Sequence, residues 1–319
     1  MNTGVKITAF AAALAATFGA AYGVGKGVGP VDEPAKAAHG EHAAANADGA
    51  KTEGGDGHAG HEEGAADAPA AGGLQVSEGG YTLAMETPKP TRGKSVLTFS
   101  IKDSAGKKVT AYTTEHGKEL HFIVASRDLT VYRHLHPVRA ADGTWSTPVD
   151  LPAAGGYKAF ADFKPAGKNA KGVTLGVDLS VPGAYAPQPL PAAARTATVD
   201  GYQVALGGTL DPGKAGELKL TVSKDGKPVD DLEPYLGAYG HLVALRDGDL
   251  AYLHVHPNEG GPGPDVSFTA TAPSAGSYRL FLDFQHGGKV RTAAFTVHAG
   301  QATAGADEAS HDAGGHTHG

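Results

Sequence analysis

Three histidines recur at a fixed spacing in two stretches of the chain. The first stretch, residues 121–137, reads HFIVASRDLTVYRHLHP, and the second, residues 241–257, reads HLVALRDGDLAYLHVHP. In each stretch a histidine is followed thirteen residues later by a second and two further on by a third, which precedes a proline. The two sets are His121, His134 and His136, and His241, His254 and His256. Imidazole is a common ligand for divalent transition metals, so both sets are candidate metal ligands.

An aspartate stands at matched positions in two later segments, Asp162 in AFADF and Asp283 in LFLDF. The aromatic neighbours predict largely buried strands, in which a carboxylate is costly unless it is paired or binds a metal. The carboxylate could ligate an ion directly or orient a ligating imidazole, and we favour the orienting role. The alternative is a histidine and aspartate network that only stabilises the core. Because both copies retain the complete set, metal binding is favoured.

The composition restricts which metal these residues could hold. The chain has no cysteine, and its two methionines are Met1 and Met85. Thiolate sites and methionine-rich Cu(I) sites are thereby excluded, so the ligands must be imidazole and carboxylate. Such donors favour a divalent transition metal over calcium or magnesium, and we expect copper first and zinc second.

Strands are the elements that must position these histidines. Side chains two apart on a strand share a face, so the two histidines of each His-x-His pair project together. Four turn residues, 127–130 and 246–249, would make a hairpin that brings His121 and His241 near the later pair of each stretch. Pro137 and Pro257, which lack an N–H, should end each ladder at a sheet edge.

Short apolar runs separated by glycine, proline and aspartate predict an all-β protein. Seven strands are expected in each of two copies, which indicates two tandem immunoglobulin-like antiparallel β-sandwiches, residues 74–182 and 197–299. The expected strands are 81–86, 95–102, 119–126, 130–136, 144–151, 156–163 and 173–181, and then 201–206, 216–222, 240–246, 250–256, 266–272, 276–284 and 289–298. Tyr157 and Tyr278, in AGGY and AGSY, fit the tyrosine corner of such sandwiches.

The remaining segments are not expected to form domains. Residues 1–31 contain an apolar run typical of an export signal, which is either cleaved or retained as a helical membrane anchor. Residues 32–73 are a disordered tether, residues 183–196 a semi-rigid proline-rich linker, and residues 300–319 a disordered tail. The tether and tail carry histidines that are either weak metal ligands or solvated filler.

Several function classes are disfavoured by the sequence. The net charge of −7 and the scattered basic residues argue against nucleic acid as a partner. No Ser/His/Asp elbow, phosphate loop or pair of catalytic carboxylates is visible, so we do not expect an enzyme. His116, His286 and His298 each occur in one copy only and are expected at the surface or in packing roles.

Three segments carry a family resemblance: GHLVALRDGDLAYLHVHP, the lead-in GKPVDDLEPYLGAYGH, and YRLFLDFQHGGKVRTAAFTV. They resemble a group of uncharacterised exported actinobacterial proteins with tandem immunoglobulin-like, YtkA-like domains that carry an HxHP motif. The resemblance covers both repeats and implies a role in the cell envelope, with heavy-metal handling as the suspected activity. The first copy departs from the pattern, since it lacks PYLG and has Lys118, Glu119 and Leu120 before His121. We expect its site either to differ in affinity or to be vestigial.

The sequence thus predicts an exported, non-catalytic protein, either extracellular or anchored on the outer face of the cytoplasmic membrane by its N-terminal segment. Each sandwich would bind copper or zinc through three histidines and an aspartate. The alternative is a module that binds an envelope protein or the cell wall, in which the histidines are purely structural.

Overall fold

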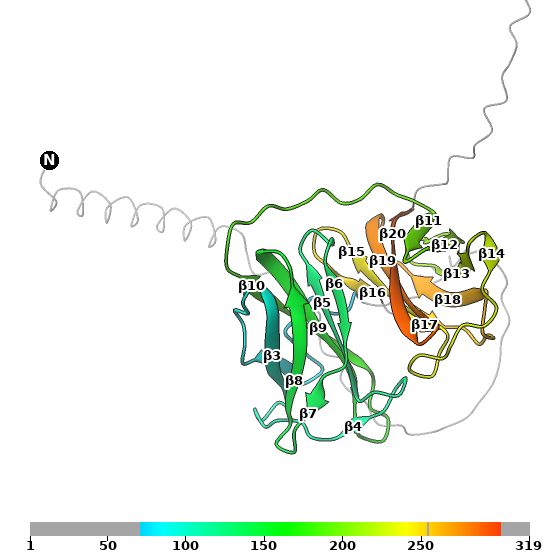
Figure 1. Cartoon of the computed structure of the whole chain (residues 1–319). Coiled ribbons are helices and arrows are strands. Elements are labelled where there is room, and N and C mark those ends of the chain that lie inside the picture. Colours follow the sequence, from blue (N-terminus) through cyan, green and yellow to red (C-terminus); the bar gives the residue numbers. More distant parts are fainter. Residues whose placement is uncertain (1–70, 254, 301–319) are drawn as a thin grey trace, which may run out of the picture. The chain divides into compact units, whose positions relative to one another are not determined.

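The computed structural model describes residues 71–253 and 255–300 of the 319-residue chain (Figure 1). The expected signal or anchor (1–31), residues 32–70 of the expected tether, and residues 301–319 of the expected tail lie outside the described residues. Within the described ranges, no helix has the length and hydrophobicity needed to cross a membrane.

The first repeat is a sandwich of two antiparallel sheets. One sheet has the spatial order β1-β2-β3-β8-β7. Its strands are β1 (Ser77–Glu78), β2 (Tyr81–Met85), β3 (Gly93–Lys102), β7 (Val138–Arg139) and β8 (Thr144–Leu151). The other sheet has the order β10-β9-β5-β6, with β4 paired to β9. Its strands are β4 (Tyr112–Thr113), β5 (Leu120–Ser126), β6 (Tyr132–Leu135), β9 (Gly155–Pro165) and β10 (Val173–Val181).

The second repeat has the same two-sheet plan. One sheet has the order β11-β12-β13-β18-β17, with β14 paired to β13. Its strands are β11 (Thr196–Val199), β12 (Tyr202–Gly207), β13 (Ala215–Lys224), β14 (Lys227–Pro228), β17 (Val255–Pro257) and β18 (Asp265–Thr271). The other sheet has the order β16-β15-β19-β20. Its strands are β15 (His241–Arg246), β16 (Tyr252–Leu253), β19 (Gly276–His286) and β20 (Lys289–Ala299).

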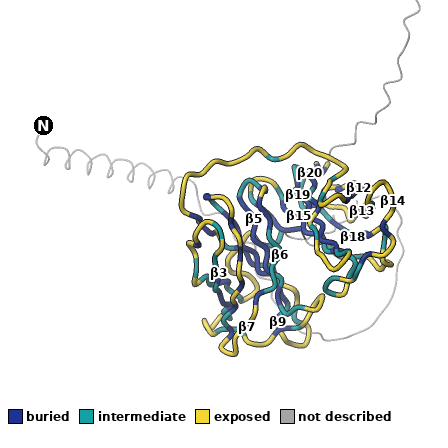
Figure 2. Tube along the Cα trace, in the orientation of Figure 1, coloured by how far each residue is buried: buried dark blue, intermediate teal, exposed yellow. Residues whose placement is uncertain are grey.

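The predicted all-β fold of two tandem antiparallel sandwiches is confirmed. Thirteen of the fourteen expected strands each correspond to one strand, whereas the expected strand 250–256 divides into β16 and β17, which pair in opposite sheets. The sheets that contain β8 and β12 have one face in the core of their repeat and one face in solvent, so their side chains alternate between buried and exposed. In β8 the inward positions, from Trp145 to Leu151, are buried at every second residue, and β12 alternates in the same way. Figure 2 shows this burial along the strands and the exposed connection between β10 and β11, where the proline-rich linker was expected.

The tyrosine corners expected from the sequence are present. The hydroxyl of Tyr157 donates to the carbonyl oxygen of Ala153 at 2.8 Å, and that of Tyr278 donates to the carbonyl oxygen of Ser274 at 2.8 Å. In both corners the residue that accepts the hydrogen bond, Ala153 or Ser274, lies four positions before the tyrosine. Both rings are buried in the core of their own repeat, so each bond pins the start of β9 or β19 to the preceding loop.

A third hydrophobic cluster joins the two repeats. The strands β5 and β15 are buried on both faces: Phe122 and Val124 lie in the core of the first repeat, whereas Ile123 lies in the inter-repeat cluster together with Val243 and Leu245. Two aromatic contacts cross this interface. Tyr132 stacks on Phe281 with ring centroids 4.0 Å apart, and Phe160 lies 5.7 Å from Tyr252. The sheet β5-β6-β9 of one repeat therefore faces the sheet β15-β16-β19 of the other (Figure 1).

The last residues of the expected tether contact both repeats. Gly72 exchanges two backbone hydrogen bonds with Tyr252 of the second repeat, at 3.1 and 2.9 Å. The amide of Gly73 donates to the carbonyl oxygen of Thr174 in the first repeat at 2.9 Å. Gly72 and Gly73 therefore pack with the repeats and do not belong to the tether, because glycine allows the backbone to lie against both sheets.

The HxHP stretch is where the chain changes sheets. In the first repeat, β6 pairs with β5 and β7 pairs with β8 in the opposite sheet, with His136 and Pro137 between them. In the second repeat, β16 and β17 divide their pairing in the same way. Pro137 does end the pairing of β6, as expected. Pro257 also ends its ladder, because it is the last residue of β17 and lies opposite Phe268 at the edge of the sheet.

Candidate metal centre

Three of the predicted ligands come together in the first repeat. One ligand nitrogen from each of His121, His134 and His136 lies within 4.8 Å of the others. The hairpin expected from the sequence produces this cluster: β5 and β6 pair with Ile123 opposite His134 and Phe122 opposite Leu135. That register carries His136 toward His121, and all three imidazoles leave the sheet on the face turned to the second repeat.

The acceptors around the cluster fix its tautomers. His134 donates from Nδ1 to Oδ2 of Asp283 at 2.8 Å, and His121 donates from Nε2 to the carbonyl oxygen of Glu115 at 3.3 Å. When both rings are neutral, His134 Nε2 and His121 Nδ1 each carry only a lone pair. These two nitrogens lie 3.1 Å apart. Two lone pairs at this distance repel each other unless a cation, either a proton or a metal ion, satisfies both.

The third histidine also presents an unsatisfied nitrogen. Nε2 of His136 is buried without a hydrogen-bond partner among the described residues, while its Nδ1 lies 3.4 Å from the hydroxyl of Tyr235. A buried nitrogen without a partner is costly, and its cost is removed if the nitrogen coordinates an ion. The cluster therefore offers three imidazole nitrogens to a common point.

Burial keeps the rings of His121 and His136 neutral at ordinary pH. The pKa of His121 and that of His136 are each lowered to about 3, first by burial and then by the neighbouring His134. The pKa of His241 is also lowered, first by burial. Metal coordination requires the neutral imidazole, so the site does not need to lose a proton from these rings before it binds an ion near pH 7.

Each aspartate lies opposite the first histidine of its own repeat, Asp283 opposite His241 and Asp162 opposite His121, but the side chain of Asp283 also reaches the other repeat. Asp283, expected beside His241, His254 and His256, contacts His134 of the first repeat. Its other oxygen accepts a hydrogen bond from Thr292, and the residue is 2% exposed. Asp162, expected to complete the first set, accepts a hydrogen bond from the Thr174 hydroxyl at 3.0 Å. The reason is geometric: both aspartates project from strands that face the other repeat.

His241 is held in the same way as His121. It donates from Nε2 to the carbonyl oxygen of Tyr235 at 2.7 Å, and its ring centroid lies 6.1 Å from that of His134 and 6.3 Å from that of His121. Its strand partner in β19 is Asp283. The other two predicted ligands of the second repeat, His254 and the side chain of His256, lie outside the described residues. The second set therefore stays a prediction.

His116, which the sequence analysis expected at the surface or in a packing role, is exposed, but it also lies beside the cluster. Its ring centroid lies 5.6 Å from that of His241 and 6.2 Å from that of His121. It occupies the turn between Glu115 and Lys118, with φ of 49°. The lead-in motif PYLG forms the equivalent turn in the second repeat. The first repeat therefore forms the same turn as the second, although it lacks the PYLG motif. Aligning Gly117 with Gly237 in the sequence could have revealed the shared turn.

The other two unmatched histidines have local partners. His286 lies between two partners in the second repeat. Its Nδ1 is 2.6 Å from the hydroxyl of Tyr202, and its Nε2 is 2.9 Å from the carboxylate of Asp231. His298 lies 3.0 Å from the hydroxyl of Ser277. Both agree with the structural roles expected from the sequence.

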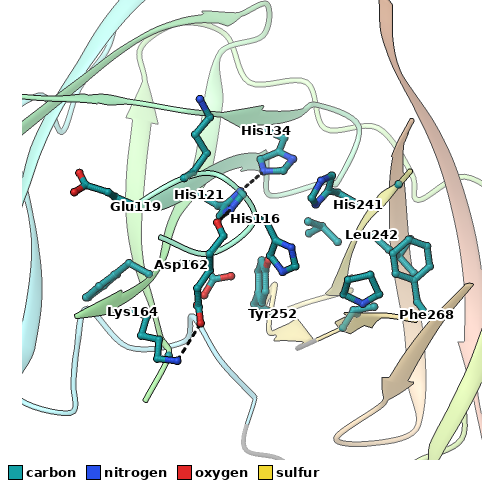
Figure 3. Close-up of a pocket in the computed structure, with 18 of the residues that line it drawn as sticks. His116, Glu119, His121, His134, Asp162, Lys164, His241, Leu242, Tyr252 and Phe268 are labelled. Atoms are coloured by element: carbon teal, nitrogen blue, oxygen red, sulfur yellow. Dashed lines mark hydrogen bonds and ion pairs between the residues drawn. The ribbon is translucent and has the colours of Figure 1, made fainter. Parts of the chain in front are cut away.

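A cavity of about 440 Å³ opens beside the cluster. Figure 3 shows the rings of His116, His121, His134 and His241 directed toward this pocket, with Asp162 and Tyr252 on its wall. Glu119 and Lys164 also line it. A cavity of this size, with imidazole and carboxylate groups in its lining, can hold water and admit a hydrated ion to the histidines.

The fold and the site define a tandem immunoglobulin-like sandwich protein with a histidine cluster at the junction of its two repeats. The chain belongs to the family described as a domain of unknown function, DUF8832, which matches residues 75–178 and 197–301. No curated protein matches the chain.

Similar solved structures share only low overall similarity. A DUF4426 family protein from Pseudomonas aeruginosa is 10% identical, with 33% of this chain and 92% of that chain covered and a TM-score of 0.24. A tetra-tandem repeat from the extending region of a large adhesion protein is 16% identical, with 69% and 48% covered and a TM-score of 0.23. Domains 5–6 of the S-layer protein SbsC are 16% identical, with 68% and 96% covered and a TM-score of 0.20. Likeness at this level carries no inference about function.

Proposed function

We propose that this protein is an exported, non-catalytic binder of a divalent transition metal, copper first and zinc second. The folded site is the cluster of His121, His134 and His136. The single observation that carries the proposal is the pair of imidazole nitrogens 3.1 Å apart, each left without a proton by the acceptor on the far side of its ring. A metal ion bound at about 2.0–2.1 Å from each nitrogen removes this repulsion.

The remaining donors support the same proposal. His136 contributes a buried nitrogen that has no other partner in the described part of the chain. Asp283, on the outer nitrogen of His134, is the carboxylate that commonly orients a metal-bound imidazole and raises its basicity. All-imidazole ligation suits copper and zinc better than calcium or magnesium. His241, His254 and His256 would form the second site by the same sequence pattern.

The most direct test is metal binding by the full chain. Cu(II) and Zn(II) are titrated by equilibrium dialysis, and electron paramagnetic resonance reports nitrogen ligation of copper. We expect a tight, stoichiometric class of sites above a weaker class from the histidines of the tether and tail. His136→Ala should remove one equivalent of tight binding, and this substitution is chosen because His136 Nε2 has no hydrogen-bond partner among the described residues.

A matched control separates folded sites from the tail. Replacing His311, His316 and His318 by alanine removes as many histidines as the cluster holds and should leave tight binding intact. Metal should also raise the free energy of unfolding, by about 2.7 kcal/mol at a free concentration one hundred times the Kd. Absence of stoichiometric binding, or tight binding that survives His136→Ala unchanged, contradicts the proposal.

The second candidate is an interaction module in which a proton, not a metal, bridges the histidines. The observation that favours it is the buried His134 and Asp283 pair, with side chains 7% and 3% exposed, which would form an ion pair with a protonated imidazole. This alternative predicts that His134→Ala destabilises the fold and that added Cu(II) or Zn(II) leaves the melting temperature unchanged.

A further inference from the structure

The histidine cluster of the first repeat makes two contacts that belong to the second repeat. His134 donates to Asp283 at 2.8 Å, and His136 lies 3.4 Å from the hydroxyl of Tyr235. In chain order these partners are 149 and 99 residues away. Two of the three candidate ligands are therefore held in place from across the repeat interface.

Asp283 is itself locked in position. One carboxylate oxygen accepts from Thr292 on the neighbouring strand β20, and the other accepts from His134. With both oxygens engaged and the side chain almost fully buried, the carboxylate has one orientation. The Nδ1 proton of His134 is therefore fixed by the second repeat, and Nε2 is left to face His121.

Tyr235 connects the two histidine sets. Its backbone carbonyl accepts from His241 of its own repeat, and its hydroxyl faces His136 of the other. The turn that contains it, closed by the bridge between Tyr235 and Ala238, corresponds to the turn that fixes His121 in the first repeat. A single turn of the second repeat thus contacts one histidine from each set.

The interface that brings these groups together is reciprocal. Tyr132 packs on Phe281, and Tyr252, at the matched position of the second repeat, packs on Phe160 at 5.7 Å. His134 lies two residues after Tyr132 on the strand, and Asp283 lies two residues after Phe281. The hydrogen bond between them continues the row of contacts begun by the aromatic pair, so it depends on the same docking of the sheets.

We infer that Asp283 and Tyr235 are positioning residues for the metal centre of the opposite repeat, and that ion binding and docking of the two sandwiches are therefore coupled. The part concerning the ion rests on the proposed function. By thermodynamic linkage, an ion that prefers the oriented cluster stabilises the docked arrangement, and any change that loosens the interface lowers the affinity for the ion.

Metal affinity is measured in the full chain with His254 and His256 replaced by alanine, so that tight binding reports the first repeat. Asp283→Asn should weaken Zn(II) or Cu(II) binding by about 10–100-fold, the usual effect of losing a carboxylate that orients a ligating histidine. The matched control is Asp231→Asn, which alters a carboxylate that accepts from His286, away from the cluster, and should leave this affinity unchanged. Tyr235→Phe should weaken binding less than Asp283→Asn, because its contact is longer.

A second measurement uses the protein without metal. Unfolding midpoints are compared for His134→Ala, Asp283→Asn and the double variant. If Asp283 acts through His134, Asp283→Asn lowers the midpoint in the parent chain and has little further effect once His134 is alanine. Additive effects overturn the inference whatever the metal result.

The two proposals fail in different ways. If the parent chain binds no metal stoichiometrically, the proposed function is wrong. The unfolding midpoints of the two single variants and the double variant then decide whether Asp283 holds His134. If the chain binds metal and Asp283→Asn leaves the affinity unchanged, or Asp231→Asn weakens it as much, the assignment of Asp283 is wrong and metal binding stands.

Discussion

Tyr132 of the first repeat and Phe281 of the second lie face to face, with ring centroids 4.0 Å apart and an angle of 6° between their planes. Both side chains are buried, and they lie beside the hydrogen bond between His134 and Asp283. This stacked pair is where the packing of the sandwiches and the geometry of the histidine cluster meet.

The first prediction concerns this pair. Phe281→Ala should lower the free energy of unfolding by about 3–5 kcal/mol, because it leaves a cavity in the inter-repeat cluster. Tyr132→Phe is the matched control. The hydroxyl of Tyr132 is buried without a partner among the described residues, so its removal should be neutral or stabilising, by up to about 1–3 kcal/mol. Urea denaturation measures both; a large loss in Tyr132→Phe would show that the hydroxyl is bonded.

The second prediction is a loss of stability in acid. The pKa of His121 and of His136 is about 3 in the folded chain and has an ordinary value of 6.5 when unfolded. As pH falls below about 6.5, the unfolded chain takes up protons that the folded chain does not, so the free energy of unfolding falls. Each ring contributes at most about 1.4 kcal/mol per pH unit, until the folded rings also titrate near pH 3.

The measurement is chemical denaturation between pH 4 and about 7.5 without metal, the range in which only the unfolded rings gain protons. His136→Gln cannot titrate and should flatten the dependence, whereas His298→Gln, which removes an exposed histidine outside the cluster, should not. A dependence that is unchanged in His136→Gln would contradict the assignment. With metal bound, the acid loss should be steeper, because protons then also compete for the ligands.

The third prediction concerns Gly73, whose φ is +68°. A Cβ on this residue would come within 2.5 Å of the Phe160 ring. Gly73→Ala should therefore cost more than the backbone penalty of about 1–2 kcal/mol for a left-handed residue. Gly80→Ala is the control, since Gly80 has φ of +84° and open space around its Cβ position. Equal midpoint shifts in thermal unfolding would mean that residues 71–73 do not pack against the first repeat.

The fourth prediction concerns the tyrosine corners. Tyr157→Phe and Tyr278→Phe each remove one hydrogen bond to a backbone carbonyl and should lower the free energy of unfolding by about 0.5–1.5 kcal/mol. Tyr185→Phe, at an exposed tyrosine of the linker, should have no effect. The comparison is made by urea denaturation. If the corner variants match Tyr185→Phe, the corners are not stabilising.

The fold could be predicted from the sequence because its signals are local. Alternating apolar residues in segments such as 144–151, with turn residues at the ends, determine strands whose bounds the structure reproduces. The tyrosine corners were equally visible as AGGY and AGSY. One signal was stronger than the prediction made from it: the unbroken apolar run from Phe122 to Ala125 is typical of a strand buried on both faces, which is what the packing of the repeats requires.

The candidate site could be predicted only in its local part. The sequence by itself determined that His121, His134 and His136 share one face and one end of a hairpin, because strand periodicity and a four-residue turn are short-range properties. It could not determine which carboxylate serves them. Asp162 and Asp283 are equivalent in sequence, and each lies beside the first histidine of its own repeat. Only the docking of the two sheets decided that Asp283 reaches His134, since a contact between residues 149 apart depends on how two separately folded surfaces pack.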